Sequence, residues 1–241
     1  MIYIHKLSPV PAKFLAIVAE FGSYQELNAN SNERDDIKRI LLNEQGCLCP
    51  YCEKRLDVRS ATIEHFQPQS TFPNLQLAYS NLYACCPKCN GNKTNHLIPA
   101  YIFDSRIDCF NNESLIKDRS ADFRLYFNPV GVYDIILEIP NYLTKSPKDS
   151  NQFHADSILY STIELLDLNN KTRLLEHRRE VYDAIIEEIV NNNNIEWLKN
   201  KYFSLKSMTK NGDCWQYEEY ISMKLFLLAE KIKRKNGLNE I

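Results

Sequence analysis

The sequence predicts an α+β fold that is mainly helical, with a small zinc-stapled core between helical N- and C-terminal regions. Two observations lead to this prediction: apolar residues recur at helical spacing near both ends, and six of the eight cysteines fall between positions 47 and 89. We expect N-terminal helices over 1–45, the cysteine-rich core over 46–104, a mixed strand and loop connection over 105–153, and a helical region over 154–241.

The N-terminal region shows two apolar stripes separated by a polar break at 28–32. Apolar residues at i, i+3, i+4 and i+7 form one face of a helix. The stripes are Phe14, Ile17, Val18 and Phe21, then Ile37, Ile40 and Leu41. Gly46 follows the second stripe, where a helix end favours glycine, so we expect the helices to stop there.

The second half of the chain predicts two strands and then helices. Strand-like runs at Leu125–Phe127 and Val132–Ile139 lie around an Asn-Pro-Val-Gly turn. Helical stripes follow, and the four asparagines 191–194 predict a break between helices. These stripes are Val181, Ile185 and Ile189, then Ile221, Leu225, Leu228 and Ile232. Core packing is the simplest interpretation of all of them.

Composition excludes some functional classes. The net charge of −2 is not that of a strongly basic nucleic-acid binder, although residues 47–106 carry a local balance of +2. The first seven residues lack a signal-peptide pattern, and no apolar run is long enough for a membrane span, so we expect a cytoplasmic protein with no membrane partner. No glycine begins a Walker A motif, so another chain would have to bind any ATP.

Two CxxC turns predict a zinc site: Cys49-Pro50-Tyr51-Cys52 and Cys86-Pro87-Lys88-Cys89. Two residues between cysteines let a tight turn direct both thiolates at one ion, and two turns complete a tetrahedral shell. A shell of four thiolates has no open position, so this Zn²⁺ is predicted to be structural and to contribute folding energy.

Other interpretations of the cysteines remain open. A thioredoxin-like redox site would need only one CxxC pair, so the second pair favours zinc. Cys85 offers a CxxxC alternative and Cys47 a CxC alternative, and we treat both as bystanders. Cys109 and Cys214 are interpreted as core or surface thiols.

The residues between and beside the CxxC turns carry further chemistry. Glu64 and His65 form an acidic–histidine pair, Asn81 precedes the second CxxC, and Asn90 and Lys93 follow it. This order resembles the HNH nuclease motif over roughly residues 47–96. The resemblance implies a ββα-metal core in which an acidic–histidine pair ends one strand and the second CxxC opens a helix.

The resemblance also implies catalytic roles. His65 would be the general base, since a histidine with an ordinary pKa of about 6.5 can take a proton from water near neutral pH. Glu64 and Asn90 would hold a catalytic Mg²⁺ or Mn²⁺ through oxygen atoms, and Asn81 would brace the loop that carries the base. The family often has Asp at the position of Glu64 and His at the position of Asn90, which leaves the metal geometry open.

Two further residues are candidates for substrate contact. Lys93 lies three residues after Asn90 on the same predicted helical face, where it would contact phosphate of a nucleic acid, DNA or RNA. His96 lies three residues further on and would line the same site.

A narrower resemblance concerns the strings Ile63–Pro68 and Ile163–Asn169, followed by Leu174 and Arg178. These strings are similar to those of the PtuB-like nuclease subunit of Septu-type antiphage defence. Such subunits also occur beside some retrons. That resemblance implies an ATPase partner of the PtuA type and a role as antiphage effector. Two alternatives stay open: a non-catalytic zinc module that binds nucleic acid or protein, and a stand-alone restriction or homing nuclease, which would need a recognition helix or basic arm that we do not find.

Overall fold

The structure is a computed structural model that describes residues 4, 6–96, 122–127, 133–138, 165–168, 174–211 and 214–235. Most of the expected 105–153 connection, its boundary at 104 and Cys109 lie outside these residues. The chain divides into two compact units, one of Tyr3–Ile98 with Met208–Glu219 and one of Pro99–Ser207 with Tyr220–Ile241. Helices and short two-stranded sheets occur together, which confirms the predicted α+β class.

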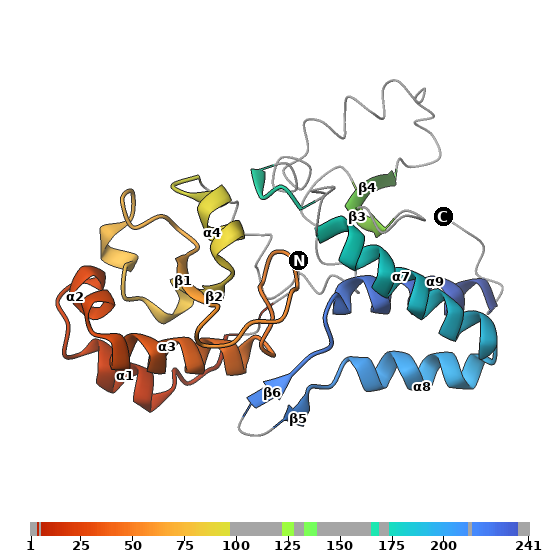
Figure 1. Ribbon diagram of the computed structural model, residues 1–241, viewed down its shortest axis with the longest axis horizontal. Helices are drawn as coiled ribbons and strands as arrows, with labels where there is room; N and C mark the ends of the chain where they lie inside the picture. The colour runs from red at the N-terminus through yellow and green to blue at the C-terminus, as the bar shows by residue number, and fades with distance from the viewer. Residues whose placement is uncertain are drawn as a thin grey trace. The chain divides into compact units, whose positions relative to one another are not determined.

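The first unit holds a helical layer, a β-hairpin-like pair with a following helix, and a hairpin from the C-terminal part of the chain (Figure 1). The elements are α1 (Ala12–Val18), α2 (Tyr24–Ala29), α3 (Ser31–Glu44), β1 (Thr62–His65), η1 (Pro73–Leu75), η2 (Tyr79–Asn81), β2 (Leu82–Cys85), α4 (Pro87–Lys93), β5 (Thr209–Asn211) and β6 (Cys214–Gln216).

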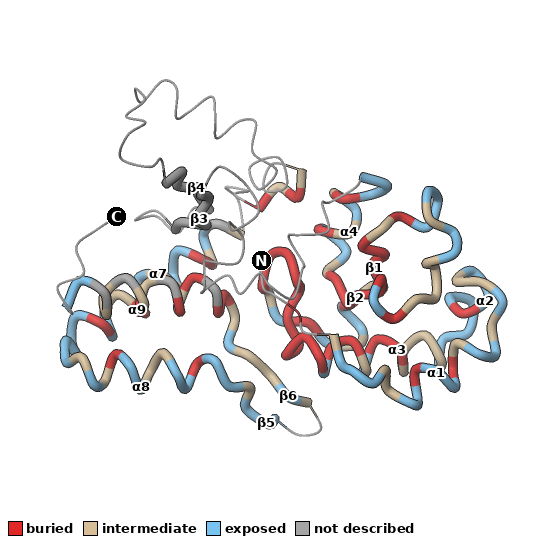
Figure 2. Tube along the Cα trace, turned by 180° about the vertical axis from the view of Figure 1, so that it is seen from behind, coloured by how far each residue is buried: buried red, intermediate tan, exposed pale blue. Residues whose placement is uncertain are grey.

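The predicted N-terminal stripes form part of the core of this unit. Phe14 and Ile17 of α1 are buried, and so are Ile37 and Leu41 of α3. Since α3 contacts α1, α2, β2 and β6, it is the element on which the rest of the unit is assembled. Figure 2 shows the buried stretch that continues from the end of α3 into the following loop.

Helix α2 begins at a capped N-terminus. The side chain of Ser23 accepts a hydrogen bond from the Glu26 N–H at 3.2 Å, and the Glu26 carboxylate accepts one from the Gly22 N–H at 2.8 Å. This reciprocal pattern satisfies N–H groups that a helix start leaves unpaired. It therefore fixes Tyr24 as the first residue of α2.

The turn after α3 joins three parts of the first unit. The Gln45 side chain accepts a hydrogen bond from the Ala84 N–H at 2.7 Å and donates one to the Ala84 carbonyl at 2.7 Å, which holds β2 against the end of α3. Gly46 has φ +61°, and a Cβ at this position would lie 2.3 Å from the Tyr217 ring. Glycine is therefore required both by the backbone and by the close approach of the C-terminal hairpin.

Strands β1 and β2 pair antiparallel, with Thr62 opposite Cys85 and His65 opposite Leu82. Helix α4 follows β2 directly and contacts β1. This strand–strand–helix order confirms the ββα core that the sequence resemblance implied.

The second unit contains β3 (Asp122–Phe127), β4 (Tyr133–Glu138), α7 (Leu174–Asn191), α8 (Ile195–Leu205) and α9 (Ile221–Lys235). Strands β3 and β4 contain parts of the two predicted strand-like runs, and they pair antiparallel with Phe127 opposite Tyr133. The predicted break at the asparagines is also present, since Asn194 accepts a hydrogen bond from the Glu196 N–H at 2.8 Å and caps α8.

The C-terminal region, expected to be helical throughout, also contains the β5–β6 hairpin, with Lys210 opposite Trp215. The hairpin belongs to the first unit, where the Tyr217 N–H donates to the Gly46 carbonyl at 3.0 Å and the Trp215 N–H donates to Asn43 at 3.0 Å. Trp215 and Asn43 are 172 positions apart in the sequence. A segment distant in the sequence thus completes the unit.

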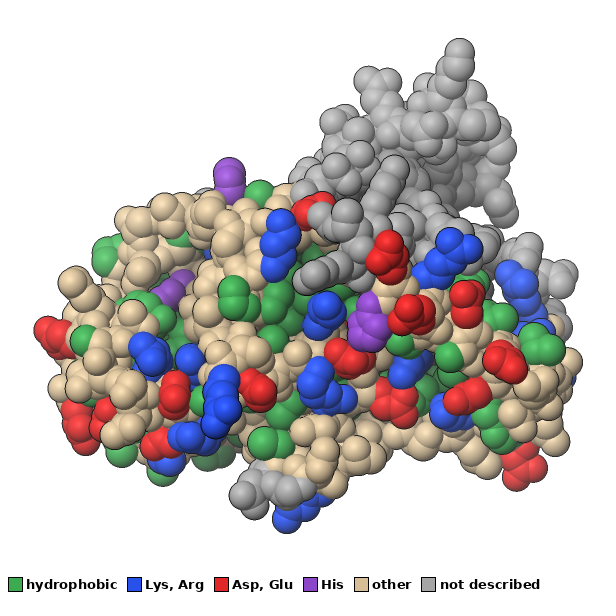
Figure 3. Space-filling view, in the orientation of Figure 1, with side chains coloured by type: hydrophobic (Ala, Val, Ile, Leu, Met, Phe, Trp, Pro, Cys, Tyr) green, Lys and Arg blue, Asp and Glu red, His purple; other side chains and the backbone are tan. Residues whose placement is uncertain are grey.

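The surface carries both signs of charge. On the face drawn in Figure 3, blue and red side chains are interspersed over the described residues, in keeping with a net charge of −2. None of the helices in the described part of the chain has the length and apolar character of a membrane span.

Candidate active site and zinc centre

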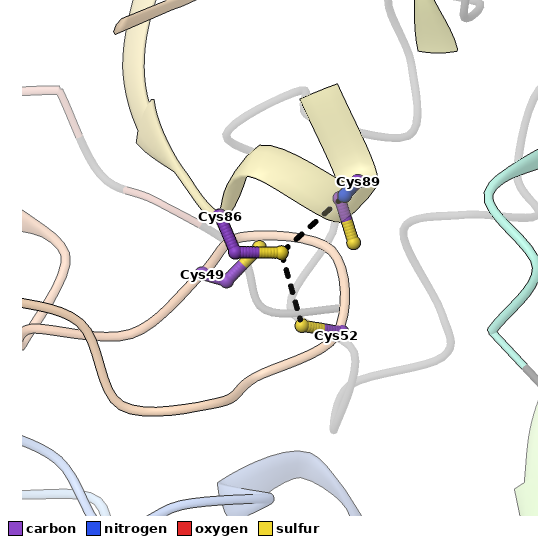
Figure 4. A group of neighbouring side chains, drawn as sticks. All are labelled: Cys49, Cys52, Cys86 and Cys89. Carbon is purple, nitrogen blue, oxygen red and sulfur yellow. Dashed lines mark hydrogen bonds between the residues drawn. The ribbon is translucent and has the colours of Figure 1, made fainter. Parts of the chain in front are cut away.

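The four cysteines of the two CxxC turns converge in the first unit (Figure 4). Cys49 and Cys52 come from the loop after α3, and Cys86 and Cys89 from the start of α4. Their sulfur atoms all lie within 4.8 Å of one another. A tetrahedral shell with Zn–S bonds of about 2.3 Å places sulfurs about 3.8 Å apart, and Cys52 Sγ lies 3.8 Å from Cys86 Sγ. The residues present fit a zinc ion.

The local sequence explains why these sulfurs meet. Pro87 occupies the first turn of α4, where its missing N–H costs nothing, and Cys86 caps the helix by accepting the Cys89 N–H at 3.4 Å. Cysteine binds metal as the thiolate, so zinc binding at this cluster would release protons.

Cys85 lies beside the four-cysteine cluster without belonging to it. Its sulfur is 3.7 Å from Cys49 Sγ and points to the Cys86 carbonyl oxygen at 3.4 Å. The sulfurs that all lie within 4.8 Å of one another are those of the two CxxC turns, and Cys85 is not one of them. The bystander interpretation of Cys85 therefore stays the better one.

Asn81 ties the long loop between β1 and β2 across the strand ends. Its side-chain oxygen accepts the Gln67 N–H at 2.7 Å, and its amide nitrogen donates to the carbonyls of Gln67 at 3.0 Å and Leu75 at 3.1 Å. The Asn81 backbone carbonyl also accepts the Phe66 N–H at 2.9 Å. Four hydrogen bonds on one residue fix the loop that follows His65.

His65 ends β1 and is 8% exposed. Its Nε2 lies 2.9 Å from the Gln76 carbonyl oxygen, and its ring packs edge-to-face on Tyr24 with centroids 4.4 Å apart. Burial lowers the pKa of His65 below 6.5, the Gln76 hydrogen bond opposes this, and the nearby Lys93 charge adds to the lowering. The ring is therefore neutral at pH 7.

Glu64 is paired with Lys93 inside the unit. Lys93 Nζ lies 2.7 Å from Glu64 Oε1, with side chains 0% and 3% exposed, and it also donates to the His65 carbonyl at 2.9 Å. The Tyr51 hydroxyl donates to the same Glu64 oxygen at 3.4 Å. Burial raises the pKa of the Glu64 carboxyl, and Lys93 and then Tyr51 oppose that rise.

Asn90, in α4, is oriented by β1. Thr62 Oγ1 donates to the Cys85 carbonyl at 3.1 Å, so it accepts the hydrogen bond from Asn90 Nδ2 at 2.9 Å. The amide nitrogen of Asn90 thus faces Thr62 and the Ile63 carbonyl, which is 3.5 Å away. Its Oδ1 is turned away from these partners, and oxygen is the atom that a hard cation would use.

A sequence model of the family described as HNH endonuclease matches residues 49–96. This stretch contains both CxxC turns, β1, β2 and α4. The chain contains an HNH endonuclease domain. Two of the relatives that share sequence with this chain are named as endonucleases.

Three relatives share sequence with this chain. The Septu protein PtuB of Bacillus thuringiensis is 42% identical over 77 residues, which cover 30% of this chain and 30% of PtuB. The protein named "Retron Vc95 putative HNH endonuclease" of Vibrio cholerae serotype O1 biovar El Tor is 26% identical over 195 residues, 77% of this chain and 80% of that protein. The CRISPR-associated endonuclease Cas9 of Actinomyces naeslundii is 36% identical over 63 residues, 26% of this chain and 6% of Cas9.

The structure brings five of the predicted site residues of the HNH domain together. Glu64, His65 and Lys93 share direct contacts, and Asn81 and Asn90 bond to the segments that flank them. Lys93, expected at the phosphate, is instead fully buried against Glu64. His96 is exposed after the end of α4, and its N–H donates to the Lys93 carbonyl at 2.9 Å.

Sequence reasoning missed three residues around the pair Glu64–His65. Tyr51, between two zinc-site cysteines, reaches Glu64, while Gln76 and Tyr24 contact His65. Tyr51 is completely buried, and its position inside a CxxC turn was the one signal that it lies near the core. Tyr24 lies among polar residues and Gln76 between two leucines, and neither position carries such a signal.

Proposed function

We propose that this protein is a metal-dependent nuclease that hydrolyses phosphodiester bonds of DNA or RNA, with His65 as the general base. The observation that carries the proposal is the 2.9 Å contact between His65 Nε2 and the Gln76 carbonyl oxygen. A carbonyl oxygen only accepts, so Nε2 holds the proton of the neutral ring. Nδ1 is then the atom that accepts a proton from the attacking water.

The donor set around β1 and α4 fits a hard cation. Glu64 offers a carboxylate oxygen and Asn90 an amide oxygen, and oxygen ligands with several waters are what Mg²⁺ or Mn²⁺ takes. When bound, such an ion supplies positive charge against the developing charge on the phosphate. Glu64 and Asn90 would hold it, while Asn81 keeps the loop beyond His65 in place.

Contacts to the phosphate backbone are proposed for Lys93 and His96. Lys93 would reach a phosphate only by leaving its buried ion pair with Glu64. His96 is exposed and needs no such rearrangement, so it is the better placed of the two. A basic side chain next to a hydrolytic site favours the polyanionic backbone of a nucleic acid.

We further propose that the nuclease is an antiphage effector that works with an ATPase partner of the PtuA type. Two of the relatives are named for a Septu system and for a retron. The match to PtuB covers less than a third of that protein, so the ATPase partner rests on the sequence resemblance, while the longer match to the retron relative supports only the association with a retron. Clustered free thiols favour the reducing cytoplasm as the place of action.

Cleavage of plasmid DNA and of total tRNA tests the proposal. The wild-type protein and His65→Ala would be compared with Mg²⁺, with Mn²⁺ and with EDTA, alone and with the candidate ATPase. Metal-dependent cutting that disappears in His65→Ala is the expected result, and it would also identify the polymer. Cutting by His65→Ala at the wild-type rate would refute the assigned base. Folded, zinc-loaded protein that cuts neither polymer under all these conditions would favour the non-catalytic zinc module.

A further inference from the structure

We infer that Tyr24, which lies outside the 49–96 match, is a positioning residue for His65 and makes the N-terminal helix α2 a working part of the active site. The inference rests on the proposed function of His65 and extends it. Two contacts carry it, one from the Tyr24 ring and one from the Tyr24 backbone.

The first contact is between rings. The Tyr24 and His65 rings meet at 90° with centroids 4.4 Å apart, which is the favoured edge-to-face geometry of aromatic pairs. Tyr24 is itself only partly buried, whereas His65 is 8% exposed, so the tyrosine ring is part of what separates the imidazole from water.

The second contact runs through Gln76. The Tyr24 N–H donates to Gln76 Oε1 at 3.0 Å, and the backbone carbonyl of Gln76 is the partner of His65 Nε2 at 2.9 Å. The same residue of α2 therefore holds the imidazole from one side and holds the segment that carries its hydrogen-bond acceptor from the other. A capped helix start at Ser23 fixes the point from which both contacts are made.

The two contacts have distinct effects on the imidazole. The Gln76 carbonyl fixes the tautomer, because Nε2 must carry the proton to donate. It leaves the ring free to pivot about that hydrogen bond, and the Tyr24 ring removes this freedom. Nδ1 thus keeps one direction, which a general base needs because misplacement by about 1 Å can cost about a hundredfold in rate.

The Tyr24 hydroxyl takes no part in these contacts, which gives the test its control. Tyr24→Phe keeps the ring, and Tyr24→Leu removes it while keeping an apolar side chain. Phe14→Leu is the matched structural control, because Phe14 is buried in α1 and packs edge-to-face on Tyr79 rather than on His65. All three variants would be measured as full-length, zinc-loaded protein.

The first readout is steady-state cleavage with the substrate that the wild type cuts. In Tyr24→Leu we expect kcat to fall about tenfold or more with KM nearly unchanged. Tyr24→Phe and Phe14→Leu should stay within about twofold of the wild type. An unchanged kcat in Tyr24→Leu, or an equal fall in Phe14→Leu, would overturn the positioning role.

The second readout does not need activity. In protein with labelled histidines, the Tyr24 ring current should displace the carbon-bound ring protons of His65, assigned by their loss in His65→Ala. The displacement should persist in Tyr24→Phe and disappear in Tyr24→Leu, whereas the Nε2–H tautomer, which the Gln76 carbonyl sets, should persist in both. Normal cleavage by His65→Ala would refute His65 as the base, but the spectra would still test whether Tyr24 holds the imidazole. Identical His65 signals in Tyr24→Leu and the wild type would refute the contact between Tyr24 and His65.

Discussion

Replacing Lys93 by methionine should destabilise the protein by far more than an ordinary lysine substitution. Lys93 is completely buried, and its ammonium lies 2.7 Å from a Glu64 carboxylate that is itself 3% exposed. Methionine keeps the apolar stem but leaves the carboxylate with the longer 3.4 Å bond from Tyr51. Removing one partner of a buried pair costs about 3–5 kcal/mol.

That loss translates into a measurable shift. For a chain of this size it lowers the melting temperature by roughly 6 to 20 °C, measured by far-ultraviolet circular dichroism on zinc-loaded protein. Lys88→Met is the matched control, since Lys88 is exposed on the same helix, and it should change the free energy of unfolding by about 0.5 kcal/mol or less. Glu64→Gln combined with Lys93→Met should recover much of the loss, because neither charge is then left alone.

The change in stability of Lys93→Met with pH tests the same ion pair independently. Burial already raises the pKa of Glu64 above 4.5, and Lys93 opposes that rise. Without Lys93 the folded-state pKa rises further, so the folded protein binds more protons than the unfolded chain, and stability falls as pH increases above 4.5. The deficit of Lys93→Met should therefore be larger at pH 8 than at pH 5. A deficit below about 1 kcal/mol, or one that is flat with pH, would refute the buried ion pair.

Three further predictions follow from the same structure. Chelation of zinc, or Cys86→Ser, should unfold the first unit as measured by circular dichroism, whereas reductant alone should not; intact structure after chelation would contradict a structural ion. The acidic limb of log(kcat/KM) against pH should break below 6.5, since the pKa of His65 is lowered; a break at a higher pH would count against this base. Gly46→Ala should lower the free energy of unfolding by more than about 1 kcal/mol, because Gly46 has φ +61° and an alanine Cβ would lie 2.3 Å from the Tyr217 ring. The fluorescence of Trp215 should change as well. An unchanged melting temperature would show that the hairpin does not pack on Gly46.

The parts of the fold that the sequence predicted are those set by short spacing. Two residues between cysteines are enough to aim two sulfurs, and the second CxxC also marks the start of α4 through Pro87. The asparagines 191–194 likewise ended one helix and capped the next, because their side chains compete for backbone hydrogen bonds. In each case the physical cause lies within a few residues of its effect.

The β5–β6 hairpin shows what such reasoning leaves out. Its strands have three residues each, too few for an alternating pattern, although the Asn211–Gly212 pair is a common signal of a tight turn. The residue after β6, Tyr217, packs against Gly46, which lies about 170 residues earlier in the chain. A glycine expected only as a helix end is also the surface on which the hairpin packs.

Tyr24 escaped prediction for a related reason. It lies 41 residues before His65, in a six-residue helix whose apolar pattern is too short to define a face. Spacing along the chain therefore gave no reason to connect the two rings. Only the packing of α2 beside the loop that carries Gln76 brings them to 4.4 Å.

Lys93 is the instructive case, because the sequence predicted its helical face and gave no indication of how deeply its side chain is buried. Three residues after Asn90, it does lie near the site, but at the inner end of α4 where Glu64 is buried. A buried carboxylate without a positive partner would lower the stability of the fold. Lys93 supplies that partner to Glu64. If Glu64 also holds the divalent ion proposed for catalysis, one carboxylate serves both that ion and Lys93. Binding of the ion and the position of Lys93 would then be coupled, and the free energy of the ion pair would set how strongly the two cations compete.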